Sequence, residues 1–200
     1  MFKTADNSYY EKIGNVVRCI DKEIPFEIPE NWEWCRLASI IIYTENFDIQ
    51  KYLSPETIIN YVDIDAIDNQ KYTIREVKKK TVRELSTRAR RVLKSGFVAY
   101  STVRPYLNNI AIIQDDLENY IGSTGFIVFK PYNIELKYLF YFLLTPYINV
   151  LYKEMMVGFN SPSISNEQFD KTLIPIPPLS EQQRIVKTTE NIFHLIAKIS

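Results

Sequence analysis

Basic residues gather in one stretch of this 200-residue chain and give it its clearest candidate chemistry. Between Lys71 and Arg104 there are 11 lysines and arginines but only two acids, Glu76 and Glu84, so this stretch carries +9. The whole chain is neutral, so the remaining residues carry −9. Charge separated in this way creates a local positive field that a polyanion such as nucleic acid can use. The other interpretation of such a stretch is a solvated surface.

One spacing in the same region is compatible with catalysis. Asp63 or Asp65, followed by Glu76 and Lys78, supplies the carboxylates and lysine with which nucleases of the Asp…Glu-x-Lys type hold Mg²⁺ and activate water. Glu-x-Lys is common by chance, and this lysine belongs to a tract that has its own electrostatic explanation. A Mg-dependent nuclease is therefore kept only as an alternative function.

Other catalytic patterns are missing from the sequence. It has no G-x-x-x-x-G-K-[ST] loop, and Gly122–Phe126 precedes an expected strand instead of opening a helix. A single histidine, His194, excludes Ser-His-Asp and Cys-His arrangements. The Pro-Pro pair at 177–178 lacks the preceding Asp or Asn of an amino-methyltransferase motif. Cys19 and Cys35 cannot form a zinc knuckle, so we expect no metal and no cofactor.

Short β-rich runs are expected to position the basic residues. They are rich in β-branched and aromatic residues and cover 39–45, 59–67, 96–103, 109–114, 124–131 and 172–177. Between them, Ser86 is expected to cap a short helix through Lys94 that carries part of the basic tract. Helices are also expected over 135–144 and from Thr145 to a stop at Gly158, with a capping box at Ser165. Strands and helices do not alternate strictly, which predicts an α+β domain with a mixed twisted sheet.

The two ends of the chain are expected to differ from this domain. Residues 1–28 are predicted to be a polar, irregular lead-in, and we place the limits of the domain at 29–179. Ser180 is expected to cap a helix over 180–200, with Gln183 at the capping-box position. Apolar residues along it follow the four- and three-residue spacing of a coiled coil: Ile185, Thr189, Ile192, Ile196 and Ile199. This pattern predicts the start of a long spacer helix that continues or pairs with a second chain; the alternative is a helix docked on its own domain.

Composition narrows the class of protein further. Hydrophobic residues make up 46% of the chain, which is typical of a globular protein and argues against disorder. The sequence contains neither an apolar run of membrane-spanning length nor a signal peptide, so we expect a cytoplasmic location.

Five segments stand in an order and spacing that resemble one known family. They are IPENWEWCRL, STVRPYLNNIAI, GSTGFIVFKP, GFNSPSIS and LIPIPPLSEQQRIV. From about Pro29 onward, the chain resembles a target-recognition domain of the DNA specificity (S) subunit of type I restriction-modification systems. The most specific part of the resemblance is Pro-Pro-Leu-x-Glu-Gln-x-Arg-Ile-Val, at 177–186.

The resemblance implies sequence-specific DNA binding without catalysis. In this family two such domains each read one half of a bipartite DNA site, and long paired helices set the distance between them. Methyl transfer belongs to the modification (methyltransferase) subunit, and translocation and cleavage belong to the restriction motor subunit. Expected partners are therefore double-stranded DNA, these two subunits and, through the C-terminal helix, a second copy of the chain. The chain departs from the family in having one domain, as an excised domain, a half-subunit or a truncated product would.

The resemblance also suggests which residues touch DNA. Basic side chains commonly hold phosphates, whereas polar side chains on loops read base edges. The expected DNA-binding residues are Lys78, Lys79, Lys80, Arg83, Arg88, Arg90, Arg91, Arg104, Asn108, Asn109, Ser123, Thr124, Asn160 and Ser161. Arg90 and Arg91 are the expected guanine readers, and Arg104, which precedes a proline, has a structural alternative. A module that binds only the modification subunit is the second alternative function.

Overall fold

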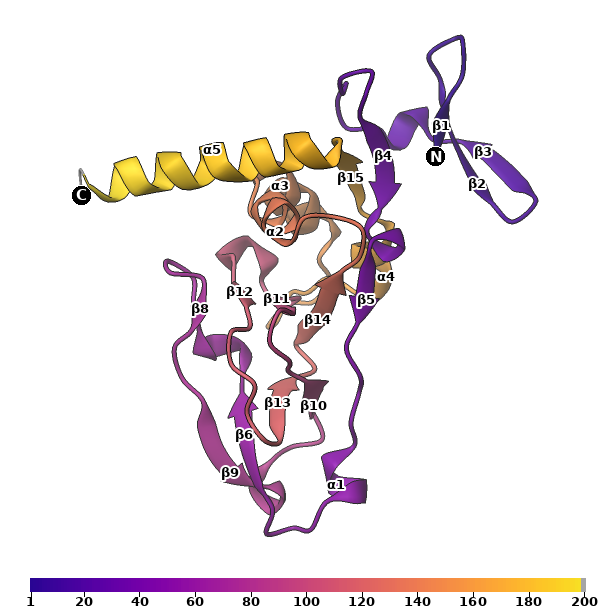
Figure 1. Cartoon of the computed structure of the whole chain (residues 1–200). Coiled ribbons are helices and arrows are strands. Elements are labelled where there is room, and N and C mark those ends of the chain that lie inside the picture. The colour runs from indigo at the N-terminus through magenta and orange to yellow at the C-terminus, as the bar shows by residue number, and fades with distance from the viewer. Residues whose placement is uncertain (199–200) are drawn as a thin grey trace.

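A computed structural model describes residues 1–198 of the protein (Figure 1). The helices are α1 (Ile49–Tyr52), α2 (Leu136–Leu143), α3 (Pro146–Met155), α4 (Asn166–Lys171) and α5 (Leu179–Ala197). The strands are β1 (Phe2–Lys3), β2 (Tyr9–Ile13), β3 (Val16–Cys19), β4 (Glu33–Arg36), β5 (Ile41–Tyr43), β6 (Ile58–Val62), β7 (Ile67–Asp68), β8 (Thr73–Ile74), β9 (Lys78–Thr81), β10 (Ala89–Val92), β11 (Val98–Ser101), β12 (Ile110–Ile112), β13 (Tyr120–Ser123), β14 (Phe126–Pro131) and β15 (Leu173–Ile176). These small sheets and few helices confirm the predicted α+β class.

The central sheet has the strand order β12-β11-β14-β5 and is antiparallel throughout. Side chains alternate along its strands because a strand has a period of two residues. Tyr100 and Phe129 pack on one face with residues of α2, α3 and α4. Ala99 and Val128 lie on the other face, in a second cluster with Val62 of β6. The sheet is therefore buried on both sides and forms the middle layer of the domain.

The distal sheet, in strand order β10-β13-β6-β9, lies in the lower half of Figure 1, away from α5. Only β13 and β6 run parallel; the other neighbours in this sheet are antiparallel. Ile59, Tyr61 and Ile121 form its core together with Val82 and Leu85. Five of the 11 basic residues of the tract belong to the two edge strands of this sheet, β9 and β10.

The predicted helix from Ser86 to Lys94 is wrong, because residues 89–92 form the strand β10. Ser86 does accept a hydrogen bond from the backbone N–H of Arg88, but this local bond closes a turn and does not cap a helix. Strand β10 pairs with β13, with an irregular register between Ala89 and Arg91. Pairing with β13 makes residues 89–92 a strand, and nothing in the sequence near Ser86 indicates this pairing.

The prediction of an irregular lead-in over residues 1–28 is also wrong. Strands β1, β2 and β3 form a three-stranded antiparallel sheet that extends to the right in Figure 1. Glu11 of this sheet is buried, and its carboxylate accepts hydrogen bonds from Arg36 (Nε–Oε1 2.9 Å) and Arg18 (Nη2–Oε2 2.6 Å). The bond from Arg36 lowers the pKa of Glu11 most, and the bond from Arg18 adds to the effect. This ion pair ties the N-terminal sheet to β4.

Helix α5 begins at Leu179, one residue before the predicted start, and Ser180 makes no capping bond. The residue that holds the start of this helix is Gln182, which is 2% exposed. Its side chain donates to the Pro177 carbonyl (2.8 Å) and accepts from the Glu135 backbone N–H (2.8 Å). The tether therefore joins α5 to the N-terminus of α2.

Several locally encoded features are confirmed. The predicted helix over 135–144 is α2, and Thr145 caps α3 through a bond from the Ile148 N–H. Ser165 and Gln168 form the predicted capping box at α4. Helix α3 ends at Met155, before the predicted stop at Gly158, and the strand expected over 59–67 ends at Val62. No helix within residues 1–198 has the length and hydropathy needed to cross a membrane.

Candidate nucleic-acid interface

Backbone hydrogen bonds join segments that are far apart in the sequence into one continuous strip, here called the central strip. The Thr124 N–H donates to the Arg88 carbonyl (2.7 Å), which joins the turn after β13 to the start of β10. The Thr102 N–H donates to the Gly125 carbonyl (2.9 Å), which joins that turn to the end of β11. The Arg104 N–H donates to the Pro162 carbonyl (2.8 Å), which adds the loop after α3. The strip thus brings Arg88, Thr124, Arg104 and Asn160 onto neighbouring segments.

Gly125 is the tightest point of the central strip. A Cβ atom at this position would lie 2.8 Å from Cγ2 of Ile64 and 3.4 Å from Nη2 of Arg88. The Arg88 side chain therefore lies over a backbone that only glycine can supply. Thr102 and Gly125 were not among the predicted site residues. The sequence signal that could have indicated Gly125 is the presence of this glycine in the Gly122–Phe126 turn.

Arg104 has an unusual backbone that orients its side chain. Its φ is 48°, in the left-handed region that arginine rarely adopts. The guanidinium Nη2 donates to the Asn160 carbonyl (3.1 Å). This bond brings together Arg104 and Asn160, two of the predicted DNA-binding residues. Arg104 therefore has a structural role, and its remaining N–H groups are available to a ligand.

The predicted polar residues differ in accessibility. Thr124 is half-buried, and Asn160 and Ser161 are exposed on the loop after α3. Ser123 is 1% exposed, and its Oγ accepts from the Gly125 N–H (3.3 Å), so it shapes the turn and is not positioned to read a base. Asn108 (φ 55°) ends the 3-10 turn Pro105–Leu107. The backbone carbonyl of Asn109 accepts a hydrogen bond from the backbone N–H of Ser101.

Strand β9 carries Lys78, Lys79 and Lys80 along one edge of the distal sheet. The register pairs Lys79 with Asn60, whereas Lys78 and Lys80 pair with the buried Tyr61 and Ile59. Neighbouring lysines therefore project to opposite faces of the sheet. Lysines on an edge strand also prevent pairing with other chains, which is a structural reason for their presence.

Besides Arg104, four of the eight predicted basic residues are engaged within the protein. Lys78 pairs with Asp65 (3.9 Å) and Glu76 (3.8 Å), Arg83 with Glu56, and Arg90 with Asp48 (3.4 Å). Arg91 donates to the Phe126 carbonyl (3.0 Å) and to Asn46 Oδ1 (3.0 Å). Burial lowers the pKa of Arg91 from its ordinary value. The geometry of Arg91 thus gives no support to its predicted role as a guanine reader.

Five basic residues of the predicted set have no carboxylate partner: Arg91, which is bonded to a carbonyl and an amide oxygen, and four others. Within the part of the chain that is described, no Asp or Glu oxygen lies within 4.0 Å of the side-chain nitrogens of Lys79, Lys80, Arg88 or Arg104. Lys79 and Lys80 lie on β9, at the opposite edge of the distal sheet from Arg88. Three strand spacings, or about 14 Å, separate the two edges, which is comparable to the width of a DNA major groove.

The residues of the nuclease alternative do not gather into a metal site. Asp63 accepts a bond from the Ile64 N–H (2.8 Å), and Lys78 lies between Asp65 and Glu76. Among residues 1–198, no group of three or more His, Cys, Asp and Glu side chains is placed to hold a metal ion.

The predicted pairing seam of α5 is divided between two environments. Ile185 packs against the central core, and Thr189 lines an apolar groove of α2 and α5. Ile192 and Ile196 are about half exposed, at 50% and 53%. Ile199 lies outside the described residues. The first half of the seam is therefore docked on its own domain, and only the second half presents a surface to solvent.

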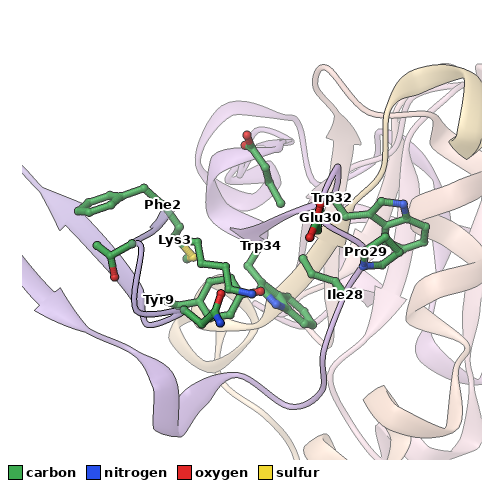
Figure 2. A pocket seen from close by; sticks show the side chains of 12 residues that line it. Phe2, Lys3, Tyr9, Ile28, Pro29, Glu30, Trp32 and Trp34 are labelled. Carbon is green, nitrogen blue, oxygen red and sulfur yellow. The ribbon is translucent and has the colours of Figure 1, made fainter.

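The N-terminal sheet borders a separate hollow of about 450 Å³, shown in Figure 2. Phe2, Lys3, Tyr9, Trp32 and Trp34 contribute to its lining. The indole Nε1 of Trp34 is buried and has no hydrogen-bond partner among the described residues. This hollow contains none of the residues of the central strip.

Solved structures share this fold. The structure resembles the HsdS subunit from Thermoanaerobacter tengcongensis with a TM-score of 0.75 and 36% identity, over 88% of this chain and 45% of that one. The S subunit from M. genitalium shares only the fold, with a TM-score of 0.52 and 11% identity, over 84% of this chain and 41% of that one.

Sequence relatives agree with the structural ones. The type I restriction enzyme MjaVIII specificity subunit of Methanocaldococcus jannaschii is 28% identical over 85% of this chain and 41% of its own length. The EcoEI specificity subunit of Escherichia coli is 26% identical over 90% of this chain and 31% of its own length. The chain thus spans less than half of each of these relatives. The type I restriction modification DNA specificity domain matches residues 29–199, and the chain belongs to this family.

Proposed function

We propose that this chain binds double-stranded DNA in a sequence-specific manner and supplies one half-site of the specificity of a type I restriction-modification complex. It performs no catalysis itself and directs the methylation and restriction carried out by its partners. The family match and the specificity subunits among its relatives support this proposal. The proposed DNA-binding unit covers residues 29–179, with 1–28 and 180–200 as additions to it.

The observation that carries the proposal is that some basic side chains are paired with acids of the protein whereas others are not. Lys79, Lys80, Arg88 and Arg104 have no carboxylate partner among the described residues, so their charge is available for phosphates. Thr124, Asn160 and Ser161 lie on the segments that adjoin Arg88 and Arg104. We assign the first group to phosphate contacts, with Lys79 and Lys80 approaching the phosphates from the two faces of the edge strand β9, and the second to base edges.

Salt-dependent DNA binding tests this function. Replacing Lys79 and Lys80 by alanine should weaken binding to all duplexes alike and lower the slope of log K against log salt by about 0.9 per lost phosphate contact. Lys12→Ala with Lys22→Ala removes the same charge from the exposed N-terminal region and serves as the matched control. An identical slope for both double variants would refute the assignment.

Partner binding is proposed for the exposed half of α5. Ile192 and Leu195 are at least half exposed, and they leave an apolar surface beside Phe193, whose ring packs on Tyr141 of α2 (5.7 Å between ring centroids). We assign this surface to assembly with the modification and restriction motor subunits or with a second copy of the chain. The same observation favours the alternative of a module that binds only protein, and retained partner binding without DNA binding would select that alternative.

A further inference from the structure

Phe159 is a large apolar side chain whose surface is completely exposed (100%). A phenylalanine side chain stabilises a fold when it is buried away from water, so this exposed ring contributes no such stability to the domain. The neighbouring Val157 is also exposed, at 75%. The loop therefore displays apolar groups outward at a position where the fold does not need them.

The loop that carries Phe159 is closed at its base. The backbone groups of Val157 and Ser163 exchange two hydrogen bonds, of 2.9 and 3.0 Å. The Pro162 carbonyl accepts from the Arg104 N–H (2.8 Å), which fixes the loop to the end of β11. These bonds hold the loop in one conformation, so little conformational entropy is lost when the ring contacts a ligand.

Gly158 sets the direction of the ring. Its φ is +113°, a conformation that residues with a side chain rarely adopt. A Cβ atom there would also lie 3.3 Å from the Ser161 carbonyl oxygen. The turn at Gly158 thus depends on glycine, and Phe159 follows it directly.

The surroundings of Phe159 are polar and positively charged. Asn160 and Ser161 follow it in the chain and are exposed. The Arg104 guanidinium lies 3.1 Å from the Asn160 carbonyl and has further N–H groups free for a phosphate. A protein interface has an apolar core within a polar rim, whereas this ring stands beside a cation with polar neighbours. That combination fits nucleic acid better than a protein partner.

We propose that Phe159 is a wedge that inserts between two stacked base pairs of bound duplex DNA, while Arg104 holds the adjacent phosphate. This inference rests on the proposed DNA binding. Apolar wedges of this kind partly unstack one base step and kink the duplex, and burial of the ring offsets the cost of unstacking. Base steps that unstack easily are then preferred at this position, so Phe159 adds specificity without a hydrogen bond to a base.

The test uses the full chain and a duplex that it selects from a pool of random sequences. 2-Aminopurine is placed at successive positions of that duplex, because its fluorescence rises when the base is unstacked. The wild-type chain should raise the fluorescence at one step. Phe159→Ala should abolish this rise and weaken binding about 10- to 100-fold, whereas Phe159→Leu, which keeps an apolar wedge, should retain both.

Phe2→Ala removes a phenylalanine from the N-terminal sheet and is the matched control; it should bind like the wild type. Circular dichroism should show all variants folded, since Phe159 is not part of the core. The wedge is refuted if Phe159→Ala binds the duplex with the affinity of the wild type and produces the same fluorescence rise. It is also refuted if Phe159→Ala binds more weakly but the wild type itself unstacks no base step. If the wild type selects no duplex at all, the proposed function fails first, and the wedge fails with it.

Discussion

Replacing Gln182 with methionine tests how α5 is held on the domain. Methionine has a similar size but forms neither of the two 2.8 Å hydrogen bonds, to the Pro177 carbonyl and from the Glu135 N–H. Each bond contributes about 1 kcal/mol, and a buried group left without a partner costs about 1–3 kcal/mol. We therefore expect the free energy of unfolding to fall by about 2–4 kcal/mol, which corresponds to a melting temperature lower by roughly 5–15 °C.

Gln183 is the matched control, because it is the exposed neighbour of Gln182 on the same helix. Gln183→Met should change the free energy of unfolding by no more than about 0.5 kcal/mol. Urea unfolding followed by circular dichroism measures both variants, and hydrogen exchange at α5 amides shows whether the loss is local. Equal stability of the two variants would refute the reasoning that Gln182, and not a cap at Ser180, fixes the start of the helix.

Two further predictions concern assembly and pH. Ile192→Asp combined with Ile196→Asp should leave the domain folded and its DNA affinity unchanged but reduce association through α5, as measured by sedimentation; an unfolded variant would mean that these residues pack on their own domain. Glu11, whose pKa is lowered by Arg36, contributes stability above its unfolded pKa of 4.5 that is lost as the pH falls through its lower folded value. Glu11→Gln should therefore cost about 1–3 kcal/mol at pH 7, and its melting temperature should converge with that of the wild type as the pH falls below 4.5 and through the lower folded pKa of Glu11; a difference that does not depend on pH would contradict this.

The nuclease alternative also has a direct test. Mg²⁺-dependent cleavage of DNA by the purified chain, abolished by Glu76→Gln, would restore that alternative. We expect no cleavage, because Lys78 lies between Asp65 and Glu76 and the described residues form no group suited to bind a metal.

The sequence by itself determined the features that depend on local interactions. Thr145 and Ser165 cap their helices because the groups that they bind lie three residues away in the chain. The sequence predicts strands β11 and β14 from their β-branched and aromatic residues, and the structure buries both faces of these strands. The family was recognisable for a related reason, since its motifs occupy continuous segments.

Only the tertiary structure decided the features that depend on distant segments. Residues 89–92 form a strand because β13 pairs with them, although their local sequence is compatible with a helix. The availability of a cation depends on which acid the fold places beside it: Arg90 meets Asp48, whereas Arg88 lies over Gly125. Charge counts along the chain contain no such information, because the fold brings acidic side chains of other segments against part of the basic tract.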